Sequence, residues 1–412
     1  MSETSFSKEK LKILLLEGIH ASAVEALRSD GYTNIDHRET ALSEPQLIEA
    51  ARDCYMIGIR SATQLTRAVF EANGTLISVG CFCIGTNQVD LDAAQERGIA
   101  VFNAPFSNTR SVAELVLAEV VLLLRGIPAR NAAAHQGRWL KSAAGSREAR
   151  GKTLGIIGYG HIGTQVGLLA ESLGMQVLYY DIEMLLALGN ARPMPTMESL
   201  LEASDIVSCH VPQTPQTDRM IDRAALARMK KGAALINASR GSVVDIVALV
   251  EALDSKHLSG AAVDVFPAEP KSNADEFISP LRGRENVILT PHIAGSTQEA
   301  QRNIGLEVSG KLMKYSNNGS TLGAVNFPEV TLPAHPGQHR LLHIHRNQPG
   351  VLSAVNSVFS QKKINIAGQY LQTNARIGYV VIDIEAPERV VSMQLRERLD
   401  RVPGTIRTRI LY

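Results

Sequence analysis

The chain has 412 residues, of which 45% are hydrophobic and 20% are charged, a composition typical of a globular protein with a sizeable core. At about 150 residues per domain, this length predicts two or three domains. The chain has 42 Lys and Arg against 41 Asp and Glu, so its net charge is +1. This near-neutral balance excludes a chain-wide basic surface, so neither nucleic acid nor a membrane is expected as the main partner.

Cysteine usage and hydropathy indicate the compartment. Cys54, Cys81, Cys83 and Cys209 form no CxxC pair and no cluster with zinc spacing, so we expect reduced thiols and no bound metal. The first ten residues lack the apolar core of a secretion signal. The most apolar stretch, residues 112–124, is too short for a bilayer, which needs about 20 apolar residues. These features predict a cytoplasmic protein.

Short apolar runs alternate with segments of helical period over most of the chain, which predicts a parallel α/β architecture. The strand candidates form two series, at 11–16, 55–59, 76–79 and 99–102, and then at 153–157, 176–180, 205–209, 233–236, 260–263 and 286–289. Between them, residues 112–124 are expected to form a buried helix that starts with a capping box of Ser111 and Glu114. After a breaker-rich linker at 330–339, the order βαββαβ predicts a ferredoxin-like unit.

The second series opens with the glycine pattern Gly158-x-Gly160-x-x-Gly163, between a strand candidate and a helix pattern. The first glycine permits a tight turn, the second lets phosphates approach, and the third lets helix and strand pack closely. Asp181 ends the next strand candidate, where an acid would hold the adenosine ribose hydroxyls and repel a 2′-phosphate. Together they predict a site for NAD rather than NADP.

Candidate functional groups follow each strand of the second series, where parallel sheets gather their ligands. They are Gly158, Asp181, His210, Arg240, Asp264 with Glu269, and His292. Arg240 can fork onto a carboxylate, His292 can accept a hydroxyl proton, and Glu269 can raise the imidazole pKa. Each residue alone could be a surface or capping group. Their convergence predicts hydride transfer from a hydroxy acid.

Three segments resemble the signatures of the D-2-hydroxyacid dehydrogenases: Asn237-Ala-Ser-Arg-Gly241, Asp264-Val-Phe-Pro-Ala-Glu269 and Thr290-Pro-His-Ile-Ala-Gly295. The resemblance extends over essentially the whole chain. It implies a Rossmann-type NAD-binding domain inserted in a discontinuous flavodoxin-like substrate domain, with a C-terminal ferredoxin-like ACT domain. The implied boundaries are 1–107 with 297–336 for the substrate domain, 108–296 for the NAD-binding domain and 340–412 for the ACT domain.

The resemblance also implies residue roles, with Arg240, Glu269 and His292 as the catalytic set. The residues expected to contact NAD are Gly158, Gly160, His161, Ile162, Gly163, Asp181, His210, Ala238, Ser239, Arg240, Asp264, His292, Ile293, Ala294 and Gly295. Ala294 stands where close relatives carry glycine, and a methyl group there should be tolerated.

Residues 80–90 and 103–114 resemble bacterial family members that carry an ACT domain and oxidise 3-phosphoglycerate to 3-phosphohydroxypyruvate in L-serine biosynthesis. This resemblance implies Arg60 as the phosphate contact, joined by Lys141 of a neighbouring subunit, with Arg240 on the substrate carboxylate. Ala62 stands where relatives often have a second arginine, which removes one cation from the phosphate site. Reduction of 2-oxoglutarate to 2-hydroxyglutarate is expected as a side activity.

The segment His343-Ile-His-Arg-Asn-Gln-Pro-Gly350 resembles the ACT signature. It implies L-serine as an inhibitory effector, with His345, Asn347 and Asn365 as its contacts, in a homotetramer closed through the ACT units. Pro336 precedes Gly337 where relatives often have Gly-Gly, and proline should stiffen that joint. The alternative is an NAD-sensing binding protein, because corepressors of this fold also retain the Arg/Glu/His set.

Overall fold

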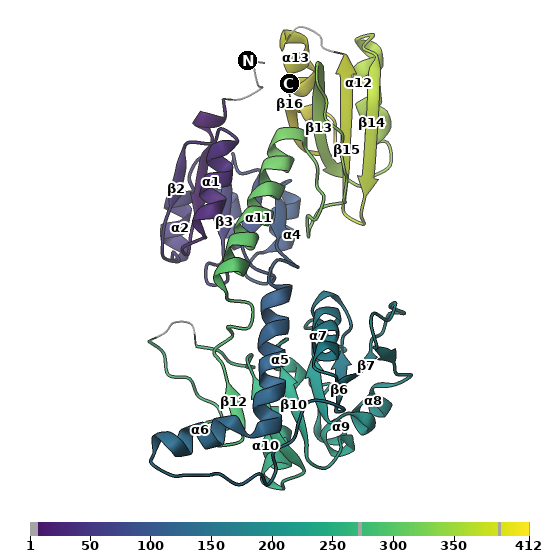
Figure 1. The fold of residues 1–412 in the computed structure, drawn as a ribbon. Coiled ribbons are helices and arrows are strands. Elements are labelled where there is room, and N and C mark those ends of the chain that lie inside the picture. Colours follow the sequence, from purple (N-terminus) through teal and green to yellow (C-terminus); the bar gives the residue numbers. More distant parts are fainter. Residues whose placement is uncertain (1–6, 271–273, 386–388, 412) are drawn as a thin grey trace. The chain divides into compact units, whose positions relative to one another are not determined.

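The computed structural model describes residues 7–270, 274–385 and 389–411 (Figure 1). It divides into two compact units, Met1–Ser107 with Gln301–Tyr412 and Asn108–Ala300. Each unit contains a parallel sheet, and the first also contains a four-stranded antiparallel sheet. The predicted fold class is confirmed, whereas the three domain boundaries given above stay a prediction.

The first unit is built on a five-stranded parallel sheet in the order β2-β1-β3-β4-β5. Its strands are β1 (Lys12–Leu15), β2 (Ile35–His37), β3 (Cys54–Ile59), β4 (Ser78–Cys81) and β5 (Ala100–Asn103). The helices of this unit are α1 (Ala21–Ser29), α2 (Glu44–Ala51), α3 (Arg67–Ala72), α4 (Leu91–Glu96) and α11 (Gln298–Asn318). The edge strand β2 was not predicted, because Ile-Asp-His is short and mostly polar.

The second unit is built on a seven-stranded parallel sheet in the order β12-β11-β10-β9-β6-β7-β8. Its strands are β6 (Thr153–Ile157), β7 (Gln176–Tyr180), β8 (Arg192–Pro193), β9 (Ile206–Cys209), β10 (Ala233–Asn237), β11 (Leu258–Val263) and β12 (Val287–Leu289). Its helices are α5 (Thr109–Arg125), α6 (Ile127–His135), α7 (His161–Ser172), α8 (Met197–Ala203), α9 (Arg223–Arg228) and α10 (Ile246–Asp254). The strand order reverses direction between β6 and β9, the position where doubly wound sheets bind ligands.

The predicted capping box at the start of α5 is wrong. The helix begins at Thr109 with Asn108 as its N-cap, so Ser111 and Glu114 lie inside it. The Ser111 hydroxyl lies 2.8 Å from Thr297 Oγ1, and Glu114 accepts a 2.6 Å hydrogen bond from Arg110. The first turn of α5 is polar and precedes its apolar stripe. The start predicted from hydrophobic periodicity is therefore one turn too late.

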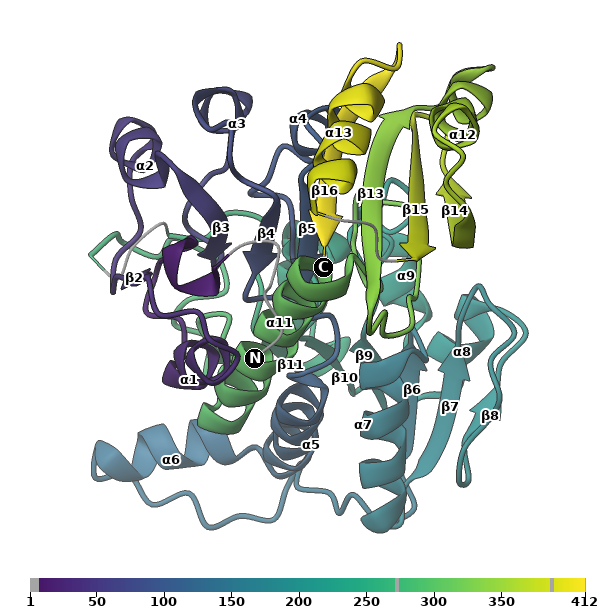
Figure 2. The ribbon, with the colours of Figure 1, turned by 90° about the horizontal axis from the view of Figure 1, so that it is seen from above.

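The antiparallel sheet forms the tail of the chain, in the strand order β14-β15-β13-β16 (Figure 2). Its elements are β13 (Gln338–Arg346), α12 (Val351–Gln361), β14 (Ile366–Thr373), β15 (Ile377–Glu385), α13 (Arg389–Asp400) and β16 (Thr405–Leu411). This is the predicted βαββαβ order with ferredoxin-like pairing.

Both faces of the interior strand β13 are buried, since its side chains alternate between the two sides of the tail sheet. Leu341 packs with α12 and α13, whereas Leu342 and Ile344 pack into the core of the first parallel sheet. Arg340 forms a buried two-point ion pair with Asp383, at 2.6 and 2.7 Å. Within the ranges that the structure describes, no helix is long and apolar enough to cross a membrane.

Candidate active site

A turn after β12 presents His292 at the edge of the seven-stranded sheet. His292 has the left-handed backbone angle φ of 54°, and its N–H donates to the Asp264 carbonyl oxygen at 2.8 Å. The Asp264 carboxylate is 1% exposed and accepts bonds from the Thr290 hydroxyl at 2.6 Å and from the N–H groups of Ile293 and Ala294 at 2.9 and 3.0 Å. Asp264 therefore holds both ends of the turn that carries His292.

Glu269 is the partner of the His292 imidazole. The Oε2 atom of Glu269 lies 2.8 Å from His292 Nδ1, and its Oε1 atom accepts the Phe266 N–H at 3.0 Å. This bond raises the pKa of His292, and burial opposes it only in part. Burial opposes ionisation of Glu269, but the bonds from His292 and Phe266 outweigh it and lower the Glu269 pKa. The pair stays partly exposed, at 54% and 35% for the side chains of His292 and Glu269.

Arg240 lies after β10 and adds a positive charge to the pair. Asn237 Nδ2 donates to the Arg240 carbonyl oxygen at 3.0 Å, and Arg240 Nη1 donates to the Ser239 carbonyl oxygen at 2.7 Å. A Cβ atom on Gly241 would lie 2.0 Å from the Phe266 carbonyl carbon, so this loop needs glycine to reach the Glu269 segment. The Arg240 charge acts on both Glu269 and His292, so the structure brings the predicted catalytic set together.

The glycine turn after β6 leaves room for a ligand. Gly158 has φ of 90°, and a Cβ atom there would lie 2.4 Å from the His210 carbonyl oxygen. A Cβ atom on Gly163 would lie 2.1 Å from the Gly158 carbonyl oxygen, whereas one on Gly160 would meet nothing within 4 Å. Gly160 is the N-cap of α7 and provides no side-chain cap, so helix N–H groups face this open space. These features fit the pyrophosphate of a dinucleotide.

The Asp181 carboxylate lies against the glycine turn. Its Oδ2 atom accepts the Tyr159 N–H at 2.7 Å, and its Oδ1 atom accepts the Glu183 N–H at 3.0 Å. The carboxylate is thus fixed after β7, at the same end of the sheet as Gly158, because all seven strands are parallel. This position fits a ribose-binding acid.

The side chain of His210, the group that follows β9, lies in partly buried surroundings. Its Nε2 atom lies 2.8 Å from Ser208 Oγ, and burial lowers its pKa to about 4. Its enclosed Nδ1 atom has no hydrogen-bond partner in the described part of the chain. His210 is therefore neutral, and its carbonyl group rather than its ring meets Gly158.

The other residues predicted to bind NAD follow the carboxyl ends of strands in the same sheet. His161 is exposed at the first position of α7, and Ile162 is half-buried beside it. Ala238 and Ser239 are buried, with the Ser239 N–H and hydroxyl both bonded to Asn237 Oδ1. Ile293 is exposed. Ala294 is buried, and a Cβ atom on Gly295 would lie 2.2 Å from Asn108 Nδ2.

Arg60 follows β3 in the first unit and lies beside Glu17. Its N–H donates to Glu17 Oε1 at 3.1 Å, and Glu17 also accepts the N–H groups of Ala62 and Thr63, each at 2.9 Å. The Arg60 guanidinium lies 3.4 Å from the Glu17 carbonyl oxygen. Glu17 was not predicted from the sequence, although the strand-end pattern applied to the first series would have found it. Lys141 is exposed, in a stretch without regular structure.

The predicted effector residues lie at two places in the tail sheet. His345 is buried near the end of β13, and Asn347 follows in the turn, where its Nδ2 atom donates to the Asn374 carbonyl oxygen at 2.8 Å. Asn365 is exposed directly before β14. Strand β15 separates β14 from β13, so one chain holds Asn365 apart from Asn347.

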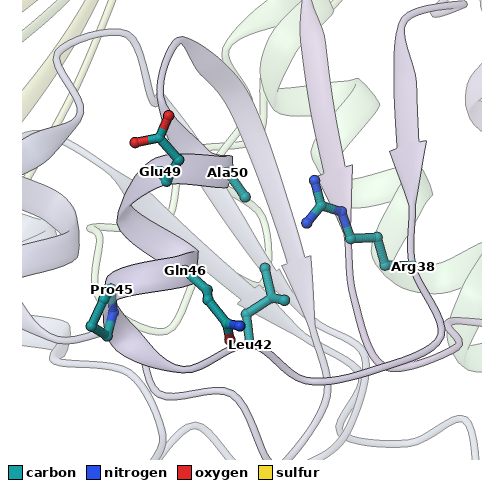
Figure 3. Close-up of a pocket in the computed structure, with 6 residues that line it drawn as sticks. All are labelled: Arg38, Leu42, Pro45, Gln46, Glu49 and Ala50. Atoms are coloured by element: carbon teal, nitrogen blue, oxygen red, sulfur yellow. The ribbon is translucent and has the colours of Figure 1, made fainter.

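A hollow outside this site lies at the edge of the first sheet, with a volume of about 490 Å³ (Figure 3). It is lined by Arg38, Leu42, Pro45, Gln46, Glu49 and Ala50. None of the predicted site residues borders it, and Asp36 engages Arg38 at 2.7 Å. Within the described ranges, no group of three His, Cys, Asp or Glu side chains could hold a metal ion.

Two family models match the chain. Residues 117–294 match the D-isomer specific 2-hydroxyacid dehydrogenase NAD binding domain, and residues 341–407 match the AHAS small subunit-like ACT domain. The D-lactate dehydrogenase of Aquifex aeolicus, solved with NAD and lactic acid, has a similar structure. It has a TM-score of 0.65 and 26% identity, and the match covers 77% of this chain and 100% of that one.

Curated relatives match over the full length. The chain is 62% identical to D-3-phosphoglycerate dehydrogenase of Escherichia coli K12 and 58% identical to that of Haemophilus influenzae, with 100% of each chain covered. NAD is the cofactor that the matched domain binds. The chain is an NAD-dependent dehydrogenase that belongs to the D-isomer specific 2-hydroxyacid dehydrogenase family and, within it, to the D-3-phosphoglycerate dehydrogenases.

Proposed function

We propose that this chain oxidises 3-phospho-D-glycerate to 3-phosphohydroxypyruvate with NAD, the first step of L-serine biosynthesis. The observation that carries this substrate is the 62% identity, over the whole of both chains, to a D-3-phosphoglycerate dehydrogenase. The geometry around His292 supplies the groups that such an oxidation needs. We further propose a cytoplasmic homotetramer with the substrate, NAD-binding and ACT domain boundaries given above.

In this reaction His292 is the general base. Its imidazole takes the proton of the substrate hydroxyl, and Glu269, 2.8 Å away, stabilises the imidazolium that forms. Arg240 holds the substrate carboxylate with two parallel hydrogen bonds. Bound NAD supplies the hydride acceptor.

The cofactor lies along the edge of the seven-stranded sheet in this proposal. The N–H groups of Gly160, His161 and Ile162 hold the pyrophosphate at the start of α7, beside the turns at Gly158 and Gly163. Asp181 bonds the ribose hydroxyls and repels a 2′-phosphate. The remaining contacts to NAD come from His210, Ala238, Ser239, Arg240, Asp264, His292, Ile293, Ala294 and Gly295.

Arg60 binds the substrate phosphate, with Lys141 contributed by a neighbouring subunit. The loop that carries Arg60 is fixed by Glu17, whose carboxylate accepts three backbone N–H groups between Arg60 and Thr63. Because Ala62 provides no second cation, Arg60 carries most of the electrostatic attraction for the phosphate.

The substrate assignment is tested by initial rates with 3-phosphoglycerate, D-lactate and 2-hydroxyglutarate. Arg60→Ala should lower kcat/KM for 3-phosphoglycerate by about 10²-fold and for D-lactate much less, because only the former has a distal phosphate. Arg38→Ala is the matched control, since Arg38 also follows a strand of the same sheet but is paired with Asp36. Equal losses for both substrates would remove Arg60 from phosphate binding. No turnover of 3-phosphoglycerate by the wild type would overturn the function.

The cofactor assignment is tested by Asp181→Ala. Loss of the carboxylate should weaken NAD binding by about tenfold and reduce the enzyme's preference for NAD over NADP. The reason is that the same group bonds the ribose and repels the 2′-phosphate. Glu183→Ala, two residues further on, is the control. An unchanged ratio of the affinities for NAD and NADP in the Asp181 variant would mean that another residue sets the preference.

We also propose that L-serine binds the ACT unit through His345, Asn347 and Asn365 and inhibits the enzyme from there. The exposed Asn347 turn at the end of β13 and the exposed Asn365 beside the edge strand β14 support this assignment. Since the two asparagines lie apart within one chain, a complete site requires two ACT units side by side.

A further inference from the structure

One buried carboxyl group near the active site has no part in the mechanism above. Glu119 lies on α5 with 1% of its surface exposed, and neither of its carboxyl oxygens has a hydrogen-bond partner within the described residues. An isolated ionised carboxylate is costly to bury, so a group in this position is held in its neutral form. Burial accordingly raises the pKa of Glu119 to about 8, and the charge of Asp264 adds to this rise.

The position of Glu119 follows from how α5 packs on the sheet, where the helix contacts β10 and β11. The Leu123 side chain lies 3.2 Å from where a Cβ atom of Gly260 would be, early in β11. Glu119 is one helical turn before Leu123, in the direction of Asp264 at the end of β11. Glu119 therefore lies between Gly260 and the end of β11, where the charge of Asp264 acts on it.

The surroundings of Glu119 offer no compensating charge. The side chains that pack between α5, α7 and the sheet form an apolar cluster that includes Val116, Val120, Val166, Ile236, Ala238, Ala262 and Ala294. Asp264 is the one charged group of the described chain that acts on Glu119, and it carries the same sign. On α5 itself, Glu114 is exposed and paired with Arg110.

We propose that Glu119 is a positioning residue: Asp264 and the His292 turn keep their places only while its carboxyl group is protonated, and loss of that proton displaces them. Asp264 accepts three donors from residues Thr290, Ile293 and Ala294, so a shift of its carboxylate moves the turn as a whole. An ionised Glu119 places a second negative charge beside Asp264 in apolar surroundings, where repulsion is strong. The inference rests on the proposed function, because His292 acts as the base only in that reaction.

The experiment follows two quantities from about pH 6 to about pH 9 in the full-length enzyme: kcat/KM with 3-phosphoglycerate and the Kd of NADH by fluorescence. In the wild type, kcat/KM should fall and the Kd should rise, each by about tenfold, above the pKa of Glu119. Glu119→Gln and Glu119→Met cannot ionise, so both should lack this alkaline change. Glu114→Gln, on the exposed face of the same helix, should keep it.

The outcomes separate the two proposals. A wild type without an alkaline change, or Glu119 variants that keep it, would overturn the positioning role. A change confined to the melting temperature, with the pH dependence of kcat/KM and Kd untouched, would make Glu119 a structural proton site and also overturn it. Absence of turnover with 3-phosphoglycerate at every pH would instead reject the proposed function, and the NADH titration would still decide the role of Glu119.

Discussion

Histidines at the carboxyl ends of the strands in the seven-stranded sheet and inside the tail sheet have opposite pKa shifts. His292 follows β12 on a half-exposed turn, and Glu269 raises its pKa. His343 and His345 lie inside β13, stacked with their ring centres 5.4 Å apart, and burial lowers the pKa of both, that of His343 to about 4. An anionic partner thus favours the protonated form of histidine, whereas burial without such a partner favours the neutral form.

The largest effect is expected for His292→Asn. The variant should lower kcat by about 10² to 10⁴-fold, because it removes the general base. NADH affinity, measured by fluorescence, should stay within about threefold, since asparagine also tolerates a left-handed backbone angle. His343→Gln, which removes a histidine that lacks an anionic partner, should leave the uninhibited rate unchanged. An equal loss of rate and NADH affinity in His292→Asn would contradict the assignment.

The second effect concerns stability in acid. The pKa of His343 falls from 6.5 in the unfolded chain to about 4 in the folded one, so the unfolded chain binds a proton that the folded chain does not. Neutral His343 therefore contributes fully to the free energy of unfolding above the pKa of the unfolded chain. This contribution, up to about 3 kcal/mol, is lost as the pH falls through the pKa of the folded chain. Denaturant unfolding of wild type and His343→Gln at about pH 7 and about pH 5 measures it. A variant as acid-sensitive as the wild type would refute the linkage.

A smaller effect is expected for Glu269→Gln. Because Glu269 raises the pKa of His292, the amide should lower that pKa, and the acid limb of kcat/KM should move to lower pH. The direction follows because a base must be deprotonated to accept the hydroxyl proton. Glu276→Gln, an exposed acid paired with Arg282 in the same segment, is the control. An unshifted pH profile would remove Glu269 from the mechanism.

The smallest effect is expected in the tail. Asn347→Ala and Asn365→Ala should each raise the L-serine concentration for half inhibition by about tenfold, the loss of one polar contact, without changing the uninhibited rate. Asn356→Ala, at a partly exposed position on α12, should leave inhibition unchanged. If millimolar L-serine does not inhibit the wild type, the tail has a structural role and the proposed regulation is wrong.

The strand-end rule accounts for what the sequence could predict of the site. Gly158, Asp181, Arg240 and His292 all follow apolar runs of clear length, and the structure has strands at each of these runs. Hydrophobic runs are local, so they can be read without knowledge of the partners that a segment meets. The order of the elements in the tail was readable for the same reason.

Features that depend on distant neighbours could not be predicted. Glu119 is one of two acidic residues in the apolar stretch 112–124, and only packing in the structure reveals that it is buried where the charge of Asp264 acts on it. The support that Glu17 gives the loop at Arg60 joins residues 43 positions apart. The burial of β13 on both faces also escaped prediction, because one face joins a cluster with β1, β3 and β5, which lie more than 200 residues earlier in the chain.

The left-handed angle of His292 has a consequence for anyone who screens this position by saturation mutagenesis. Every replacement removes the imidazole, so an activity assay would score all of them alike. The yield of folded protein would nevertheless sort the library by backbone tolerance, since φ of 54° suits glycine, asparagine and aspartate and penalises valine, isoleucine and proline. The backbone angle at a catalytic position can thus restrict which residues allow folding, and this restriction is seen only when abundance and turnover are scored separately.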